Sequence, residues 1–68
     1  MTRFRVSLYG CFQPLLVDIP ATDIAELHEL LSRSRFLPAH LVEADGERSS
    51  CDALISVQRI QLIVEVVE

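Results

Sequence analysis

The first part of the chain repeats apolar residues with a period of two. Apolar and polar residues alternate over residues 4–8 and, after the turn-forming residues 10–14, again over residues 15–19. This alternation is typical of strands that bury one face. The sequence therefore predicts a hairpin with a loop of about five residues, a common hairpin length. Pro20 closes the hairpin because proline cannot donate to a continuing ladder.

A helical period follows the hairpin. Asp23 is a favourable N-cap residue, and Glu26 completes a capping-box pattern three residues later. The next apolar residues fall on one stripe at helical spacing: Ile24, Leu27, Leu30 and Leu31. Pro38 disfavours the helical conformation for the residue before it, so the helix is expected to fade near Ser34 or Arg35.

The second half of the chain predicts further strands with one change of phase. Residues 39–44 alternate weakly, and Asp45-Gly46 is a turn signal that opens a polar, mobile stretch reaching Ser50. Apolar residues alternate in one phase over 55–57 and in the other over 60–66. A strand cannot change phase without a bulge or a turn. Gln58-Arg59 lacks the residues of a two-residue hairpin, so a tight corner or one 3₁₀ turn is expected.

The order of elements predicts one α+β domain over residues 1–68: two strands, a helix, a strand, and then one bent strand or two. A curled, mainly antiparallel sheet would pack on the single helix. The opening is similar to the ubiquitin-type start of β-grasp domains. The bent tail resembles the corner that joins the last strands of SH3-like and Sm-like small barrels. Neither similarity rests on a motif, and a fold alone does not carry a function.

Charge and hydropathy limit the classes of partner. The formal net charge is −4, and all six basic residues are arginine. An acidic chain repels phosphate, which argues against nucleic acid and anionic membranes as partners. No apolar run approaches the roughly 20 residues that span a bilayer, and the first residues lack the apolar region of a secretory signal. We therefore expect a cytoplasmic location, and the arginine bias suggests a bacterial origin.

The sequence offers little support for catalysis, a metal or a cofactor. With two glycines in the chain, a phosphate-binding loop is not expected. The residues that would make a Cys2His2 set lie more than ten positions apart: Cys11, His28, His40 and Cys51. Structural zinc ligands usually come in close pairs, so both cysteines are expected at turns or as small buried residues. We predict no metal, no cofactor, no catalytic residue and no enzymatic activity.

Three acidic residues around the Asp-Gly turn form the remaining candidate ion site. Glu43, Asp45 and Glu47 alternate and could share a face. A calcium loop needs more oxygen ligands in a defined twelve-residue frame. The spacing also describes an ordinary solvated loop, and we expect no ion there.

The last strand supports a role in protein interaction. Residues 60–67 are apolar on both sides, with Ile63 and Val67 opposing the main row. Strands of this kind lie at the centre of a sheet or under a partner. The sequence therefore predicts an accessory or regulatory module that binds a protein or itself, most simply as a homodimer. Leu16, Ile63 and Val67 are the expected interface residues, unless they pack under the helix or the long loop.

A small nucleic-acid-binding barrel is the alternative function. Arg3 and Arg5 alternate onto the outward face of the first strand, and Tyr9 follows on the same face as a stacking platform. Arg33, Arg35 or Arg59 could extend such a patch. The negative net charge and the absence of lysine weigh against this function.

Overall fold

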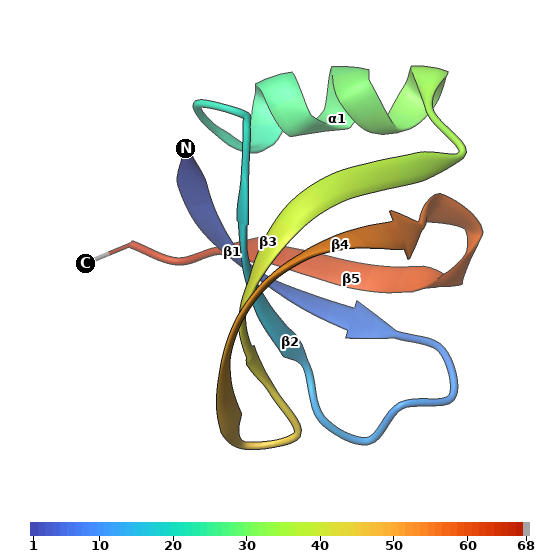
Figure 1. The fold of residues 1–68 in the computed structure, drawn as a ribbon. Coiled ribbons are helices and arrows are strands. Elements are labelled where there is room, and N and C mark those ends of the chain that lie inside the picture. Colours follow the sequence, from blue (N-terminus) through green and yellow to red (C-terminus); the bar gives the residue numbers. More distant parts are fainter. Residues whose placement is uncertain (68) are drawn as a thin grey trace.

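The computed structural model describes residues 1–67. Its elements, in chain order, are β1 (Thr2–Leu8), β2 (Leu15–Ile19), α1 (Ile24–Arg33), β3 (Phe36–Ala44), β4 (Glu47–Ser56), the 3₁₀ turn η1 (Val57–Arg59) and β5 (Ile60–Glu65). The strands form one sheet in the order β4-β3-β2-β1-β5, and all neighbours are antiparallel. The sheet is strongly twisted, and α1 lies over one end of it (Figure 1). The predicted small α+β domain is confirmed.

The first hairpin follows the predicted alternation. Phe4 lies opposite Val17 in the β1–β2 ladder, and both side chains are fully buried. Val6 and Ile19 are also fully buried, so one face of the hairpin is the centre of the core. The burial of these apolar side chains sets the register, because a slip of one residue would expose all of them.

Helix α1 adds one buried residue to the core, with Leu30 and Leu31 packed against it, and side-chain hydrogen bonds hold its N-terminus. Leu27 is fully buried, whereas Ile24, also expected on the buried stripe, is 47% exposed. Asp23 caps the helix as predicted, because its Oδ1 accepts a hydrogen bond from the Glu26 amide at 2.9 Å. Glu26 accepts from the Thr22 hydroxyl at 2.8 Å instead of reaching back to the Asp23 amide. β5 supplies a further acceptor, because Glu65 Oε1 accepts a hydrogen bond from the Ile24 amide at 3.0 Å.

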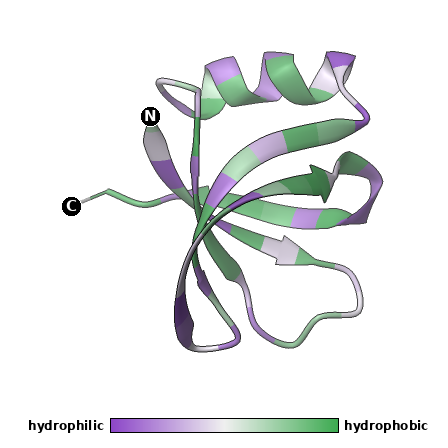
Figure 2. Cartoon of the chain, viewed as in Figure 1, coloured by the Kyte–Doolittle hydropathy of each residue, from purple (hydrophilic) through white to green (hydrophobic). Residues whose placement is uncertain are grey.

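Strands β3 and β4 are longer than the sequence predicts. The polar residues 47–50, expected to be a mobile stretch after the turn, form the start of β4 instead. Asp45 and Gly46 both have positive φ, at 53° and 78°, as a tight two-residue hairpin turn requires. That turn brings polar residues into a ladder with β3, where backbone pairing replaces the missing apolar alternation. Figure 2 shows the hydrophilic colour concentrated at this hairpin.

The change of phase near residue 58 has the predicted structure. Val57–Arg59 forms one 3₁₀ turn, and the Val57 amide donates to the Arg35 carbonyl at 2.9 Å. The chain then returns as β5, antiparallel to β1, and the Tyr9 amide donates to the Arg59 carbonyl at 2.8 Å. A search of residues 1–67 for a helix both long and apolar enough to cross a membrane finds none.

Candidate functional site

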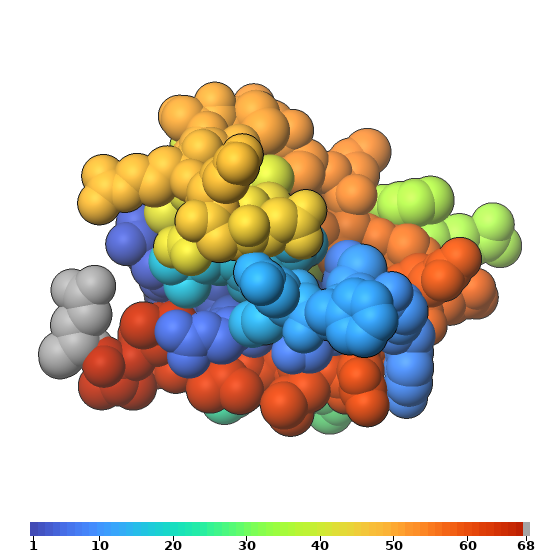
Figure 3. Space-filling model, turned by 90° about the horizontal axis from the view of Figure 1, so that it is seen from below, coloured from blue at the N-terminus to red at the C-terminus, as the bar shows by residue number. Residues whose placement is uncertain are grey.

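The edge strand β5 carries the exposed apolar residues with the clearest common arrangement. Leu62 is 57% exposed and Val64 is 44% exposed. They lie opposite Ser7 and Arg5 of β1, on the face of the sheet away from the core. Figure 3 shows β5, in orange and red, along one rim of the molecule beside the blue β1. This rim, defined by Leu62 and Val64, is named the β5 edge.

Ile63, one of the expected interface residues, faces the core side of the sheet, which is the alternative placement that the sequence left open. Ile63 lies opposite Val6, which is fully buried, and residues directly opposite in an antiparallel pair share a face. Ile63 is accordingly half-buried and packs against the core. Both rows of this strand are apolar, so the alternation could not reveal which one faces inward. The register with β1 decides that Leu62 and Val64 face outward.

The other two predicted interface residues lie apart from Ile63. Leu16 is half-buried and lies opposite Arg5, on the outer face of β2. Val67 lies beyond the end of β5 and is 83% exposed, while the Val66 amide before it donates to the Arg3 carbonyl at 2.9 Å. The structure therefore places the three residues on two faces of the sheet and on its C-terminal extension. Leu62 and Val64 were missed by sequence reasoning.

An apolar groove lies on the helix side of the same strand. Its volume is about 330 Å³ and it runs between α1 and β5. The helix contributes Ile24, Leu27, His28 and Leu31, and the strand contributes Ile60, Gln61, Leu62 and Ile63. Leu62 belongs to both surfaces, so the β5 edge continues into apolar surface on the helix side, whereas on the outer face it borders Ser7 and Arg5 of β1.

The arginine patch proposed for nucleic acid is partly neutralised within the fold. Arg3 Nε and Nη2 donate to the two carboxylate oxygens of Asp18, at 3.0 and 3.3 Å. This hydrogen bonding, helped by the charges of Arg3, His40 and the N-terminus and opposed by burial, holds the pKa of Asp18 below 3.8. Arg5 and the 56% exposed Tyr9 stay on the surface. A phosphate would have to compete with Asp18 for Arg3, so the structure adds no support to nucleic-acid binding.

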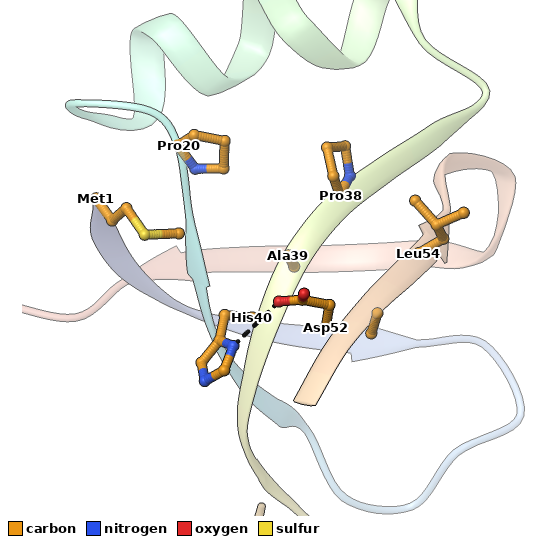
Figure 4. A pocket seen from close by; sticks show the side chains of 8 residues that line it. Met1, Pro20, Pro38, Ala39, His40, Asp52 and Leu54 are labelled. Carbon is orange, nitrogen blue, oxygen red and sulfur yellow. Dashed lines mark hydrogen bonds and ion pairs between the residues drawn. The ribbon is translucent and has the colours of Figure 1, made fainter. Parts of the chain in front are cut away.

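A second groove opens where the β2–β3 ladder ends. Asp18 pairs with His40, and two residues further along this register Pro20 would face Pro38. Neither proline has an N–H to donate, so the ladder cannot continue there. The resulting groove, named the proline groove, has a volume of about 390 Å³. Its lining consists of Met1, Pro20, Pro38, Ala39, His40, Asp52, Ala53 and Leu54 (Figure 4).

Three polar side chains form a hydrogen-bonded chain at one end of the proline groove. His40 Nδ1 lies 3.2 Å from Asp52 Oδ1, and His40 Nε2 lies 3.3 Å from Ser50 Oγ. An ionised carboxylate can only accept, so in the neutral imidazole Nδ1 carries the hydrogen and Nε2 accepts from the Ser50 hydroxyl. The side chain of His40 is 37% exposed and that of Asp52 is 98% exposed. Sequence reasoning named His40 but not its two partners.

The candidate metal ligands do not come together. In residues 1–67 no three His, Cys, Asp or Glu side chains are grouped so that they could hold an ion. Cys11 is exposed in the β1–β2 loop, as expected for a turn position. Cys51 is exposed within β4, so the expectation that it lies at a turn or is buried is wrong. The reason is that residues 47–52 became a strand with little apolar cover.

Comparison with known proteins assigns the chain to no family. No family model matches it, and neither a curated protein nor a solved structure is significantly similar.

Proposed function

We propose that the chain is a protein-interaction module that associates with a second copy of itself through the β5 edge. The observation that carries this proposal is that Leu62 and Val64 are exposed on a strand that ends the sheet order. An edge strand presents backbone groups ready to pair with another strand. A cytoplasmic, accessory or regulatory role in a bacterium, as the sequence suggests, is part of the same proposal.

The faces of the strand select one way of pairing β5 with its own copy. Opposed residues in an antiparallel pair share a face, so the twofold axis must pass through a residue. An axis through Ile63 places Leu62 of each copy opposite Val64 of the other copy, and both residues lie on the outer face. An axis through Leu62 would place Val64 of one copy opposite Ile60 of the other. These two residues do not match, because Val64 lies on the outer face and Ile60 packs on the core. The pairing centred on Ile63 is therefore favoured.

Charge and area are compatible with this pairing. With Ile63 at the centre, Glu65 faces Gln61, so no like charges lie directly opposite each other despite the net charge of −4. A stable interface usually buries about 800 Å² on each partner, which is roughly one sixth of the 4931 Å² accessible surface of this chain. The apolar groove between α1 and β5 supplies area next to the paired strands.

Light scattering coupled to size exclusion tests the proposal over a series of protein concentrations. We expect a dimer at tens of micromolar and a monomer after Leu62→Lys, because a charge on an edge strand opposes pairing. Phe12→Lys is the matched control, since Phe12 is fully exposed and belongs to the β1–β2 loop, not to β5. A wild-type protein that stays monomeric at hundreds of micromolar would contradict the proposal.

Cysteine cross-linking tests the register. In a Cys11→Ser, Cys51→Ser background, a mixture of Leu62→Cys and Val64→Cys chains should form an intermolecular disulfide, because these positions face each other. Either chain alone should cross-link several-fold more slowly. Equal rates for the mixture and the single chains would exclude the pairing centred on Ile63.

A further inference from the structure

We propose that Ser50, His40 and Asp52 form a nucleophilic site that accepts the acyl group of activated esters with an apolar acyl chain. A nucleophile hydrogen-bonded to a base, which is in turn oriented by a third group, is the arrangement that activates a serine. Here the Ser50–His40 and His40–Asp52 distances are 3.3 and 3.2 Å. This proposal is independent of self-association, and it departs from the expectation that the chain has no enzymatic activity.

The sheet itself positions the three groups. Ser50 and Asp52 are two residues apart on β4 and project to the same side, and His40 lies directly opposite Asp52 on β3. The ladder shifts register between Leu41 and Glu43, so that Ser49 and Ser50 together oppose one residue of β3. A β-bulge of this kind re-aims a side chain, and here Ser50 Oγ reaches His40 Nε2.

The proline groove gives the site its selectivity for acyl groups. Pro20 and Pro38 lie across from each other, with Met1 and the 71% exposed Leu54 nearby and the His40–Asp52 pair at one end (Figure 4). A groove of about 390 Å³ is large enough for a medium-length alkyl or aryl chain. Ser50 lies outside the lining of the groove and contacts the Nε2 of His40, so an acyl chain held there would cover part of His40 and extend its carbonyl past the imidazole to reach Ser50.

The reaction needs no group beyond these side chains, the ester and water. Ser50 Oγ attacks the ester carbonyl carbon while His40 Nε2 takes the hydroxyl proton. The carbon–oxygen bond to the alcohol breaks, and His40 returns the proton to the departing alkoxide. Water then cleaves the acyl-serine in the same manner, releasing the carboxylic acid and restoring the serine.

Exposure limits the size of the effect. Asp52 is 98% exposed, so water screens its interaction with His40. Asp52 is therefore a positioning residue, and Asp52→Asn should slow acylation by only a few fold, with Asp52→Glu restoring most of the rate. His40 acts directly as the base. General-base assistance is worth about 10²–10⁴-fold in enclosed sites, and in this open site we expect about tenfold.

Covalent labelling with an octyl fluorophosphonate tests the proposal, with the modified residue identified by peptide mass spectrometry. We expect a label on Ser50 that is lost in Ser50→Ala, is about tenfold slower in His40→Gln, and is unchanged in Ser49→Ala. Ser49 is the matched control because its hydroxyl contacts Cys51 Sγ at 3.4 Å instead of His40. Label on another residue, or an equal rate in His40→Gln, would overturn the proposal.

Turnover of p-nitrophenyl esters gives a second measurement. Hydrolysis of the hexanoate should exceed that of the acetate, and Leu54→Ser in the proline groove should remove this preference while leaving Ser50 in place. Thermal unfolding of each variant checks that the fold is kept. Equal hydrolysis by wild type and Ser50→Ala would also overturn the proposal.

Discussion

The two edges of the sheet differ in how they meet water. The β4 edge begins with Glu47 and Arg48, continues through serines to the exposed Asp52, and contains the bulge in the β3–β4 ladder. Charges and bulges are the devices that keep an edge strand from pairing with another chain. The β5 edge also has a bulge, between Ile60 and Leu62 in its ladder with β1, but beyond it the strand presents the apolar Leu62 and Val64. One sheet thus has one protected edge and one edge suited to pairing.

The edges also differ in how firmly the core holds them. Ile55 of β4 is 4% exposed and belongs to the core, whereas Ile63 of β5 is only half-buried at its margin. The core anchors β4 at Ile55, although Cys51 on the same strand is exposed. β5 has no fully buried side chain and carries apolar residues on its outer side, so it has more to gain from a second copy.

The largest expected effect is on the free energy of unfolding, when the inward-facing isoleucines of β4 and β5 are truncated. Ile55→Ala should lower the free energy of unfolding by about 2–5 kcal/mol, because it leaves a cavity in a small core. Ile63→Ala, made together with Leu62→Lys to remove association, should cost less than half as much relative to Leu62→Lys alone. Urea unfolding followed by circular dichroism measures both costs. Equal losses would show that the two strands are anchored alike.

A smaller effect concerns the bond between β5 and the helix. Glu65→Gln keeps the shape of the side chain but weakens the acceptor for the Ile24 amide, and should lower the free energy of unfolding by about 1 kcal/mol. Glu47→Gln, at the exposed start of β4, is the control and should change it by less than half as much. Equal urea midpoints for the two variants would show that the Glu65–Ile24 hydrogen bond does not stabilise the fold.

A weaker effect is expected from the Arg3–Asp18 pair at the centre of the sheet, and it should appear in the pH dependence of the free energy of unfolding. The pKa of Asp18 is lower in the fold because Arg3 hydrogen-bonds to its carboxylate. This contribution is present above about pH 4, the unfolded value, and is lost as the pH falls below it. The stability difference between wild type and Asp18→Asn should therefore shrink from pH 5 to pH 2. A difference independent of pH would exclude this role for Asp18.

The smallest expected effect is on the β4 side of the sheet. Leu54 is 71% exposed, yet Leu54→Lys should leave the concentration dependence of association unchanged, because β4 is not the proposed pairing edge. Light scattering of Leu54→Lys beside Leu62→Lys makes this comparison. If Leu54→Lys also gives a monomer, association uses the β4 side, and the contrast between the two edges is lost.

Local patterns were enough to predict most elements of this fold. The period-two hairpin, the Asp23 cap, the Asp45-Gly46 turn and the 3₁₀ turn at Val57–Arg59 all depend on residues close in sequence. The start of β4 was missed because its polar residues are held in a strand by pairing with β3 rather than by burial. Strand pairing of that kind leaves no alternation to detect.

The β5 edge and the Ser50–His40–Asp52 group could be identified only from the tertiary structure. The apolar residues of 60–67 were visible in the chain, but only the pairing of Ile63 with buried Val6 decides which row faces water. Likewise His40 meets Ser50 and Asp52 only because β3 and β4 pair with a bulge between them. Local preference depends on neighbours in the chain, while the facing of a strand and the meeting of side chains depend on which strands pair and in what register.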